Sequence, residues 1–153
     1  MGRILKYGFL FFVIAFIGIQ FIEVDKTNPE VTADIQAPPE VKRILRSSCY
    51  DCHSNETRWP FYSSIAPISW FIADDVNEGR EKVNFSNWEK LYSEKQDELK
   101  RKIWKEINED EMPMSTYIYM HPDAKLGLPQ KDIIKKWATG NDFFNLDFQK
   151  RLK

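Results

Sequence analysis

The five residues Cys49-Tyr50-Asp51-Cys52-His53 decide how the rest of this chain is interpreted. They form a Cys-x-x-Cys-His sequence, which is the attachment signature of c-type haem. Haem carries two vinyl groups on neighbouring pyrrole rings, and two thiols at this spacing can each form a thioether with one of them. The imidazole that follows then lies beneath the ring as the proximal iron ligand. We therefore predict covalent haem c on Cys49 and Cys52, with His53 bound to iron.

Other uses of the two thiols fit the sequence less well. The chain has two cysteines in all, which excludes a disulfide-stapled secreted scaffold. A zinc site needs four ligands, and only His121 lies elsewhere to join the motif, at a spacing that matches no common zinc finger. A thioredoxin-like redox pair requires a βαβ context, whereas the surrounding sequence indicates helices. Haem attachment remains the favoured interpretation.

An uninterrupted apolar stretch near the N-terminus, residues 7–22, reads YGFLFFVIAFIGIQFI. As a helix these 16 residues would span roughly 24 Å, which is shorter than the roughly 30 Å hydrocarbon core of a bilayer. Snorkelling of the flanking side chains and local thinning of the bilayer can make up the difference. No site resembling Ala-x-Ala follows the stretch, so a cleaved signal peptide is disfavoured. We predict an uncleaved signal anchor over residues 1–22.

The charges on either side of this stretch predict its orientation. Arg3 and Lys6 precede it, and Glu23 and Asp25 follow it. The positive-inside rule places the basic end in the cytoplasm and the rest of the chain across the membrane. In a bacterial cell this means a single-pass protein of the inner membrane whose haem domain faces the periplasm.

Composition sets the remaining limits. A chain of 153 residues allows one ordinary domain with additional segments. Its 22 basic and 23 acidic residues leave a net charge of −1, which gives no electrostatic case for nucleic acid. We divide the chain into the anchor, a polar linker over 23–37, a c-type haem-binding domain over 38–140 and a C-terminal tail over 141–153.

Apolar residues in the exported part recur at helical spacing, and alternating strand patterns are almost absent. The expected helices run from 38 into the motif, from about 67 to 79, from 93 to 108, and from 128 to a stop at 140. We predict a mostly α fold, a small cytochrome c-like bundle of four or five short helices around haem, preceded by one transmembrane helix.

Three local features are specific enough to be tested. Ser93-x-x-Gln96 predicts a capping box at the start of its helix. The helix near 67–79 is expected to bury one apolar face, composed of Ile68, Phe71, Ile72 and Val76. Residues 110–122, rich in Met and Tyr and containing two prolines, are expected to form a loop.

The sixth iron ligand of an electron-transfer cytochrome is usually Met or a second His. Met1 lies on the other side of the membrane, which leaves Met112, Met114 and Met120, with His121 as a nitrogen alternative. Met112 is favoured because it follows a helix and is stiffened by the next residue, a proline. Met114 and His121 remain open.

Two further residues are candidates for contact with haem. Arg58, five residues after His53, could form a charge-assisted hydrogen bond with a haem propionate. Trp59 is one of several aromatic side chains available to wall the flat apolar faces of the macrocycle.

Several motifs occur in an order that resembles the haem-binding domain family, a group of small bacterial proteins related to c-type cytochromes. They are Cys49–Asn55, Trp59-Pro60, Pro67–Trp70, Val76–Arg80, Asn84–Trp88, Met112-Pro113, His121–Leu126 and Trp137. Met114 stands where the family's common pattern has a second proline. The resemblance implies covalent haem through Cys49 and Cys52, with His53 as an axial ligand.

The function expected from these features is electron transfer by a membrane-anchored cytochrome whose haem iron cycles between Fe(III) and Fe(II). The sequence shows no catalytic dyad or triad, and it does not identify the redox partner proteins. The alternative is a haem enzyme or sensor, peroxidase-like or gas-binding, with an open or labile sixth iron position.

Overall fold

The computed structural model describes residues 2–140, so the predicted tail over 141–153 lies outside the described part of the chain. The α-helices are α1 (Gly2–Ile19), α2 (Pro39–Ser48), α3 (Tyr50–His53), α4 (Ile68–Lys82), α5 (Ser93–Asn108), α6 (Ser115–Met120) and α7 (Leu128–Thr139). Three 3-10 helices join them: η1 (Phe61–Ser64), η2 (Phe85–Lys90) and η3 (Pro122–Ala124). No strand occurs within residues 2–140. The predicted helical fold class is confirmed.

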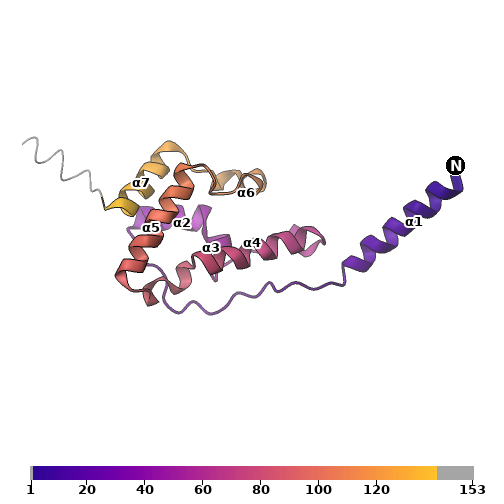
Figure 1. The fold of residues 1–153 in the computed structure, drawn as a ribbon, viewed down its shortest axis with the longest axis horizontal. Helices are drawn as coiled ribbons and strands as arrows, with labels where there is room; N and C mark the ends of the chain where they lie inside the picture. Colours follow the sequence, from indigo (N-terminus) through magenta and orange to yellow (C-terminus); the bar gives the residue numbers. More distant parts are fainter. Residues whose placement is uncertain (1, 141–153) are drawn as a thin grey trace, which may run out of the picture.

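The helix α1 lies apart from the others at one end of the molecule (Figure 1). It has no buried residue and a mean hydropathy of 1.8. Its 18 residues rise through about 27 Å, so it is long and apolar enough to cross a membrane. Within the described range it is the one helix with this property, and it begins earlier than the predicted apolar stretch because residues 2–6 are also helical.

The remaining helices form one bundle around a shared core. Helix α2 buries one apolar face, formed by Val41, Ile44 and Leu45 at i, i+3 and i+4. Helices α5 and α7 pack against each other, and Leu99 and Ile134 join the same core. Helix α7 ends as expected, because Gly140 adopts a left-handed conformation with φ of 65°.

The region expected as a loop over 110–122 contains helix α6. Pro113 and Pro122 bracket a proline-free run of residues, and Ser115–Met120 forms a short helix between them. This brings the α-helices after α1 to six, one more than predicted. The sequence signal failed because six residues are too few to display a helical period.

The capping box predicted at the start of α5 is wrong, although the helix bounds are right. The Ser93 hydroxyl bonds to the Glu94 carboxylate, and no side chain caps the helix. The Gln96 side chain instead donates to the carbonyls of Trp88 and Leu91. These carbonyls belong to the turn that leads into the helix, and the Gln96 side chain bonds to them instead of forming the predicted cap.

Helix α4 differs from its prediction in length and in orientation. It continues past Gly79 to Lys82. Its buried residues are Ser69, Ala73, Val76 and Gly79, whereas Ile68 and Phe71 are exposed. Of the four side chains expected to form its inner face, Val76 alone is fully buried. Small residues lie on the inner side because α3 packs closely against it.

The segment 23–37 has no helix or strand, yet it is part of the packed structure. Ile35 is completely buried, and its amide donates to the Phe85 carbonyl at 2.9 Å. The Ala33 amide donates to Ser86 O at 3.0 Å, and its carbonyl accepts from Glu89 N. A chain that began at the predicted domain start, Pro38, would therefore lack a core side chain.

Shortening this buried side chain tests the observation. We expect Ile35→Val to lower the free energy of unfolding by about 1 kcal/mol, because one methylene leaves a filled core. Val31→Ala, at an exposed position in the same segment, should change it by less than about 0.5 kcal/mol. Urea unfolding of the full chain in detergent measures both, and equal effects would contradict a core role for Ile35.

Candidate haem site

The motif is built at a break between two helices. Helix α2 ends at Ser48, and Cys49, with φ of −132°, separates it from the single turn of α3. The amides of Cys52 and His53 both donate to the Cys49 carbonyl, at 3.2 and 2.9 Å. Residues at i, i+3 and i+4 share one side of a helical turn, so Cys49, Cys52 and His53 are directed toward the same region.

His53 is held by two backbone carbonyls of α4 and its end. Its Nδ1 lies 2.9 Å from Gly79 O and 3.1 Å from Val83 O. Burial lowers the pKa of His53, which favours the neutral ring. A neutral imidazole that donates through Nδ1 carries its lone pair on Nε2, the atom a metal would bind. The Phe85 ring meets the imidazole edge-on at 6.3 Å between centroids.

Gly79 permits this arrangement. A Cβ atom at this position would lie 2.6 Å from the carbonyl oxygen of Cys52, closer than real Cβ contacts allow. The absence of a side chain therefore lets α4 approach the motif until its carbonyls reach His53. From the sequence, Gly79 was expected to end this helix. Because the helix continues past it to Lys82, the glycine instead indicates a position where another part of the backbone approaches closely.

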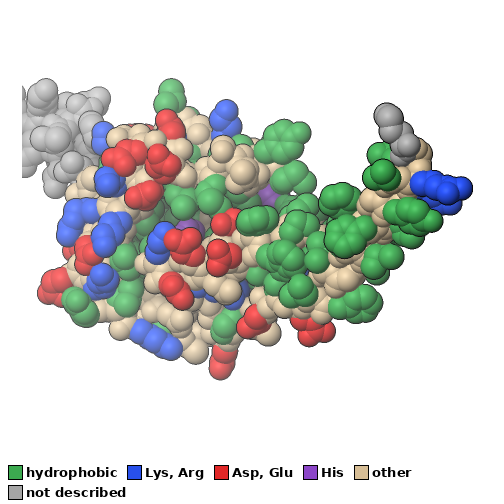
Figure 2. Space-filling view, turned by 45° about the vertical axis from the view of Figure 1, so that its right-hand side comes forward, with side chains coloured by type: hydrophobic (Ala, Val, Ile, Leu, Met, Phe, Trp, Pro, Cys, Tyr) green, Lys and Arg blue, Asp and Glu red, His purple; other side chains and the backbone are tan. Residues whose placement is uncertain are grey.

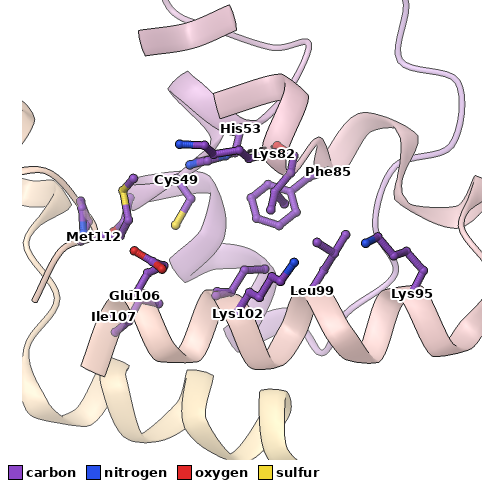
Figure 3. Close-up of a pocket in the computed structure, with 14 residues that line it drawn as sticks. Cys49, His53, Lys82, Phe85, Lys95, Leu99, Lys102, Glu106, Ile107 and Met112 are labelled. Atoms are coloured by element: carbon purple, nitrogen blue, oxygen red, sulfur yellow. Dashed lines mark hydrogen bonds between the residues drawn. The ribbon is translucent and has the colours of Figure 1, made fainter. Parts of the chain in front are cut away.

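A cavity of about 430 Å³ opens beside the motif. Cys49 and His53 line it on one side, and Met112, Ile107, Ile103 and Leu99 contribute to its other walls. Figure 3 shows the sulfur atoms of Cys49 and Met112 near one end of the cavity. Its size is in the range of cofactor and ligand sites, and its lining is mostly apolar.

A second, smaller hollow of about 60 Å³ adjoins the first. It shares Cys49, His53 and Met112 with the larger cavity and adds Cys52 and Met114. The structure thus brings together both motif thiols, the motif imidazole and the favoured methionine. Met114 lies next to this group, so it remains an alternative.

His121 is placed differently from the two methionines. It lines neither hollow; its ring stacks on Tyr117 at 4.4 Å, and its Nε2 lies 3.3 Å from the Tyr62 hydroxyl. The sequence favoured Met112 but left His121 open as an alternative, since both follow α5 in the chain. The fold separates them because α6 lies between the two residues.

Arg58 and Trp59 also line neither hollow. The Arg58 guanidinium forms a two-point pair with Asp51 of the motif, Nε to Oδ1 at 3.1 Å and Nη2 to Oδ2 at 3.2 Å. Tyr117 donates to the same carboxylate at 2.8 Å. The Trp59 indole N–H is buried without a hydrogen-bond partner in the described part of the chain. The structure gives Arg58 a role in bracing the motif, and its contact with a propionate stays a prediction.

The larger cavity has charged side chains that sequence analysis did not single out. Lys82, Lys95, Lys102 and Glu106 contribute to its lining, the first from α4 and the others from α5. Two of these lysines form ion pairs with Glu98 on the outer surface. Helical periodicity places charged residues on an exposed face and gives no signal that these side chains line a cavity.

The environment of the thiols disfavours a reactive redox pair. Burial raises the pKa of Cys49 to about 12, and burial together with Asp75 raises that of Cys52 to about 11. Reactive redox cysteines require stabilised thiolates, the opposite shift. In residues 2–140 no group of three or more His, Cys, Asp and Glu side chains is arranged to hold a metal ion.

Comparison with known proteins supports haem binding by this chain. The model of the haem-binding domain family matches residues 14–140, most of the chain. A search of curated proteins and a search of solved structures each found no match. The match includes the motif, helices α2 to α7 and the last third of α1. The chain belongs to the haem-binding domain family.

Proposed function

We propose that this protein is a c-type cytochrome that carries electrons on the periplasmic face of the inner membrane, to which α1 anchors it. The observation that supports this most is the convergence of Cys49, Cys52, His53 and Met112 on one largely apolar hollow. When bound, haem would supply a one-electron Fe(III)/Fe(II) couple.

The residues present fit such a cofactor. Each motif thiol can add its S–H across a vinyl double bond, so two thioethers form and no group leaves. His53 keeps its proton on Nδ1, fixed by the carbonyls of Gly79 and Val83, and offers Nε2 to iron. Met112 lines the same hollow and could offer its thioether sulfur to the iron, and its backbone is held by a hydrogen bond from its amide to Glu106 O at 3.2 Å.

The apolar lining has a separate role in this proposal. Phe85, Leu99, Ile103 and Ile107 surround the cavity and would limit the access of water to the cofactor. Burial and axial Met ligation both influence the reduction potential of a haem, and Met raises it.

The proposal is tested by spectroelectrochemistry of the full chain, matured in a host that attaches haem. We expect a Soret band, a reversible one-electron wave and no spectral change on addition of CO, since both axial positions would be filled. A high-spin spectrum that responds to CO or peroxide would contradict electron transfer and favour the enzyme or sensor alternative.

Replacing the favoured ligand is the sharpest variant for this test. We expect Met112→Ala to lower the reduction potential by on the order of 100 mV and to make the iron reactive toward CO, because a potential-raising thioether is lost. Met114→Ala is the matched control and should leave both properties almost unchanged. The reverse pattern would assign the sixth ligand to Met114.

A further inference from the structure

Large apolar side chains are exposed on the outer side of η1 and the first turns of α4. Phe61 is 81% exposed and Phe71 is 69% exposed, and Ile65 and Ile68 lie between them in the chain and are also exposed. We call these four residues the η1–α4 apolar face. In the space-filling view, apolar side chains continue from the domain toward α1 (Figure 2). A contiguous patch of this kind marks an interaction surface.

The η1–α4 apolar face is fastened beside the end of the candidate membrane helix. The Gln20 side chain, just after α1, donates to Ala66 O and accepts from Ala66 N, both at 3.0 Å. Lys26 donates to the Ser64 hydroxyl at 2.7 Å. Ala66 lies between η1 and α4, so these bonds hold the apolar face where the chain leaves α1.

Helix α6 adds to the same surroundings. Tyr119 is 83% exposed, and Met120 beside it is exposed as well. The helix is joined to η1 through Tyr62, whose ring lies 6.2 Å from that of His121. Exposed aromatic and aliphatic side chains of this mixture suit the boundary between lipid headgroups and acyl chains.

We propose that the η1–α4 apolar face rests in the interfacial layer of the same lipid bilayer that α1 spans. This inference rests on the proposed membrane anchoring and is independent of haem. Lipid is the expected partner of this face because the hydrogen bonds between Gln20 and Ala66 place it at the level where α1 would leave the bilayer. Glu23 and Asp25 follow the anchor beside Lys26, so apolar contact, not attraction to anionic headgroups, drives the association.

The arrangement would also orient the haem site. The N-terminal end of α4 would lie at the bilayer, and the opposite end, which reaches His53 through Gly79 and Val83, would lie further out. From Ile68 to Lys82 the helix rises through about 21 Å. The larger cavity would thus open away from the lipid, where a soluble partner can approach.

Photo-crosslinking of the full chain in phosphatidylcholine vesicles tests this proposal. A benzophenone amino acid replaces one exposed side chain at a time, as Phe61→p-benzoylphenylalanine and Phe71→p-benzoylphenylalanine. The matched controls are the same replacement of Tyr92 and of Leu128, which are 68% and 84% exposed. After illumination, mass spectrometry quantifies lipid adducts, and flotation of the vesicles reports anchoring separately.

We expect lipid adducts at positions 61 and 71 to exceed those at 92 and 128 by about tenfold or more, because only an inserted side chain meets acyl C–H bonds continuously. Equal, low lipid yields in vesicles that retain the protein would overturn the proposal. Adducts of doubled protein mass at 61 and 71 would overturn it in favour of a second copy of the chain. Protein that does not float with vesicles would refute the anchoring itself, whereas loss of the Soret band alone would refute only the haem proposal.

Discussion

Covalent haem is expected to disappear when both motif cysteines are replaced, in the double variant Cys49→Ser with Cys52→Ser. A hydroxyl group does not form the thioether, so no covalent link to either vinyl group remains. Both side chains are only partly exposed and lie beside His53, and Ser is close to Cys in size, so the fold of the motif should persist. The effect expected is complete: no haem stain in a denaturing gel.

Intact mass measures the same change. Because both thiols add to haem without a leaving group, the wild-type mass should exceed that of the polypeptide by one whole haem, and the double variant should show the bare polypeptide. The single variants serve as controls, since each keeps one thiol and should retain haem at lower yield. A haem-stained band from the double variant would refute attachment through this motif. Wild-type protein with no added mass and no Soret band would refute the cytochrome proposal entirely.

The second large effect is expected at a residue without a side chain, in Gly79→Ala. Alanine raises helix propensity by about 1 kcal/mol over glycine. Its Cβ would, however, lie 2.6 Å from Cys52 O, and the obstacle is backbone, which cannot move aside as a side chain tip could. Overpacking costs about 1–3 kcal/mol, and weakening the part-buried His53 hydrogen bonds adds about 1–3 kcal/mol. After the gain in helix propensity is subtracted, we expect a net destabilisation of about 1–5 kcal/mol.

The position of α4 should change the iron ligation as well as the stability. If α4 is displaced from α3, His53 loses its carbonyl partners, and the low-spin spectrum should give way to a mixture of spin states. Asn77→Ala, on the exposed side of the same helix, is the control and should leave both the spectrum and the urea midpoint nearly unchanged. Wild-type stability and spectrum in Gly79→Ala would show that α3 and α4 do not need this close approach.

Three parts of the molecule could be predicted because their signals are local. The motif is recognised from five consecutive residues, since thioether chemistry fixes the spacing of the thiols and the imidazole. Helices α2, α5 and α7 follow from the period of their apolar residues, and Pro at the start of α2 and α7 and Gly at the end of α7 add to the signal. The membrane-compatible helix follows from an apolar run with no internal charge.

The errors arose where a side chain's partner is distant in the sequence. Ser93 and Gln96 have the spacing of a capping box, yet Gln96 finds carbonyls of the preceding turn. Ile68 and Phe71 have the spacing of a buried face, yet α3 accepts only small residues on the side of α4 that meets it. Ile35 sits in a polar stretch without periodicity, and its burial depends on pairing with η2, fifty residues later.

The order of residues along the chain specifies which chemical groups are available: two thiols and an imidazole at haem spacing, a methionine-rich stretch, and an apolar helix at one end. Folding then selects which of these groups come into contact. It supplied the carbonyls of Gly79 and Val83 to His53 across 26 and 30 residues, and it placed Met112 at the motif while turning His121 away. The spacing of the thiols and the imidazole is a property of consecutive residues, so it can be recognised in the sequence. The partner of a buried polar atom depends instead on how closely two separate helices pack.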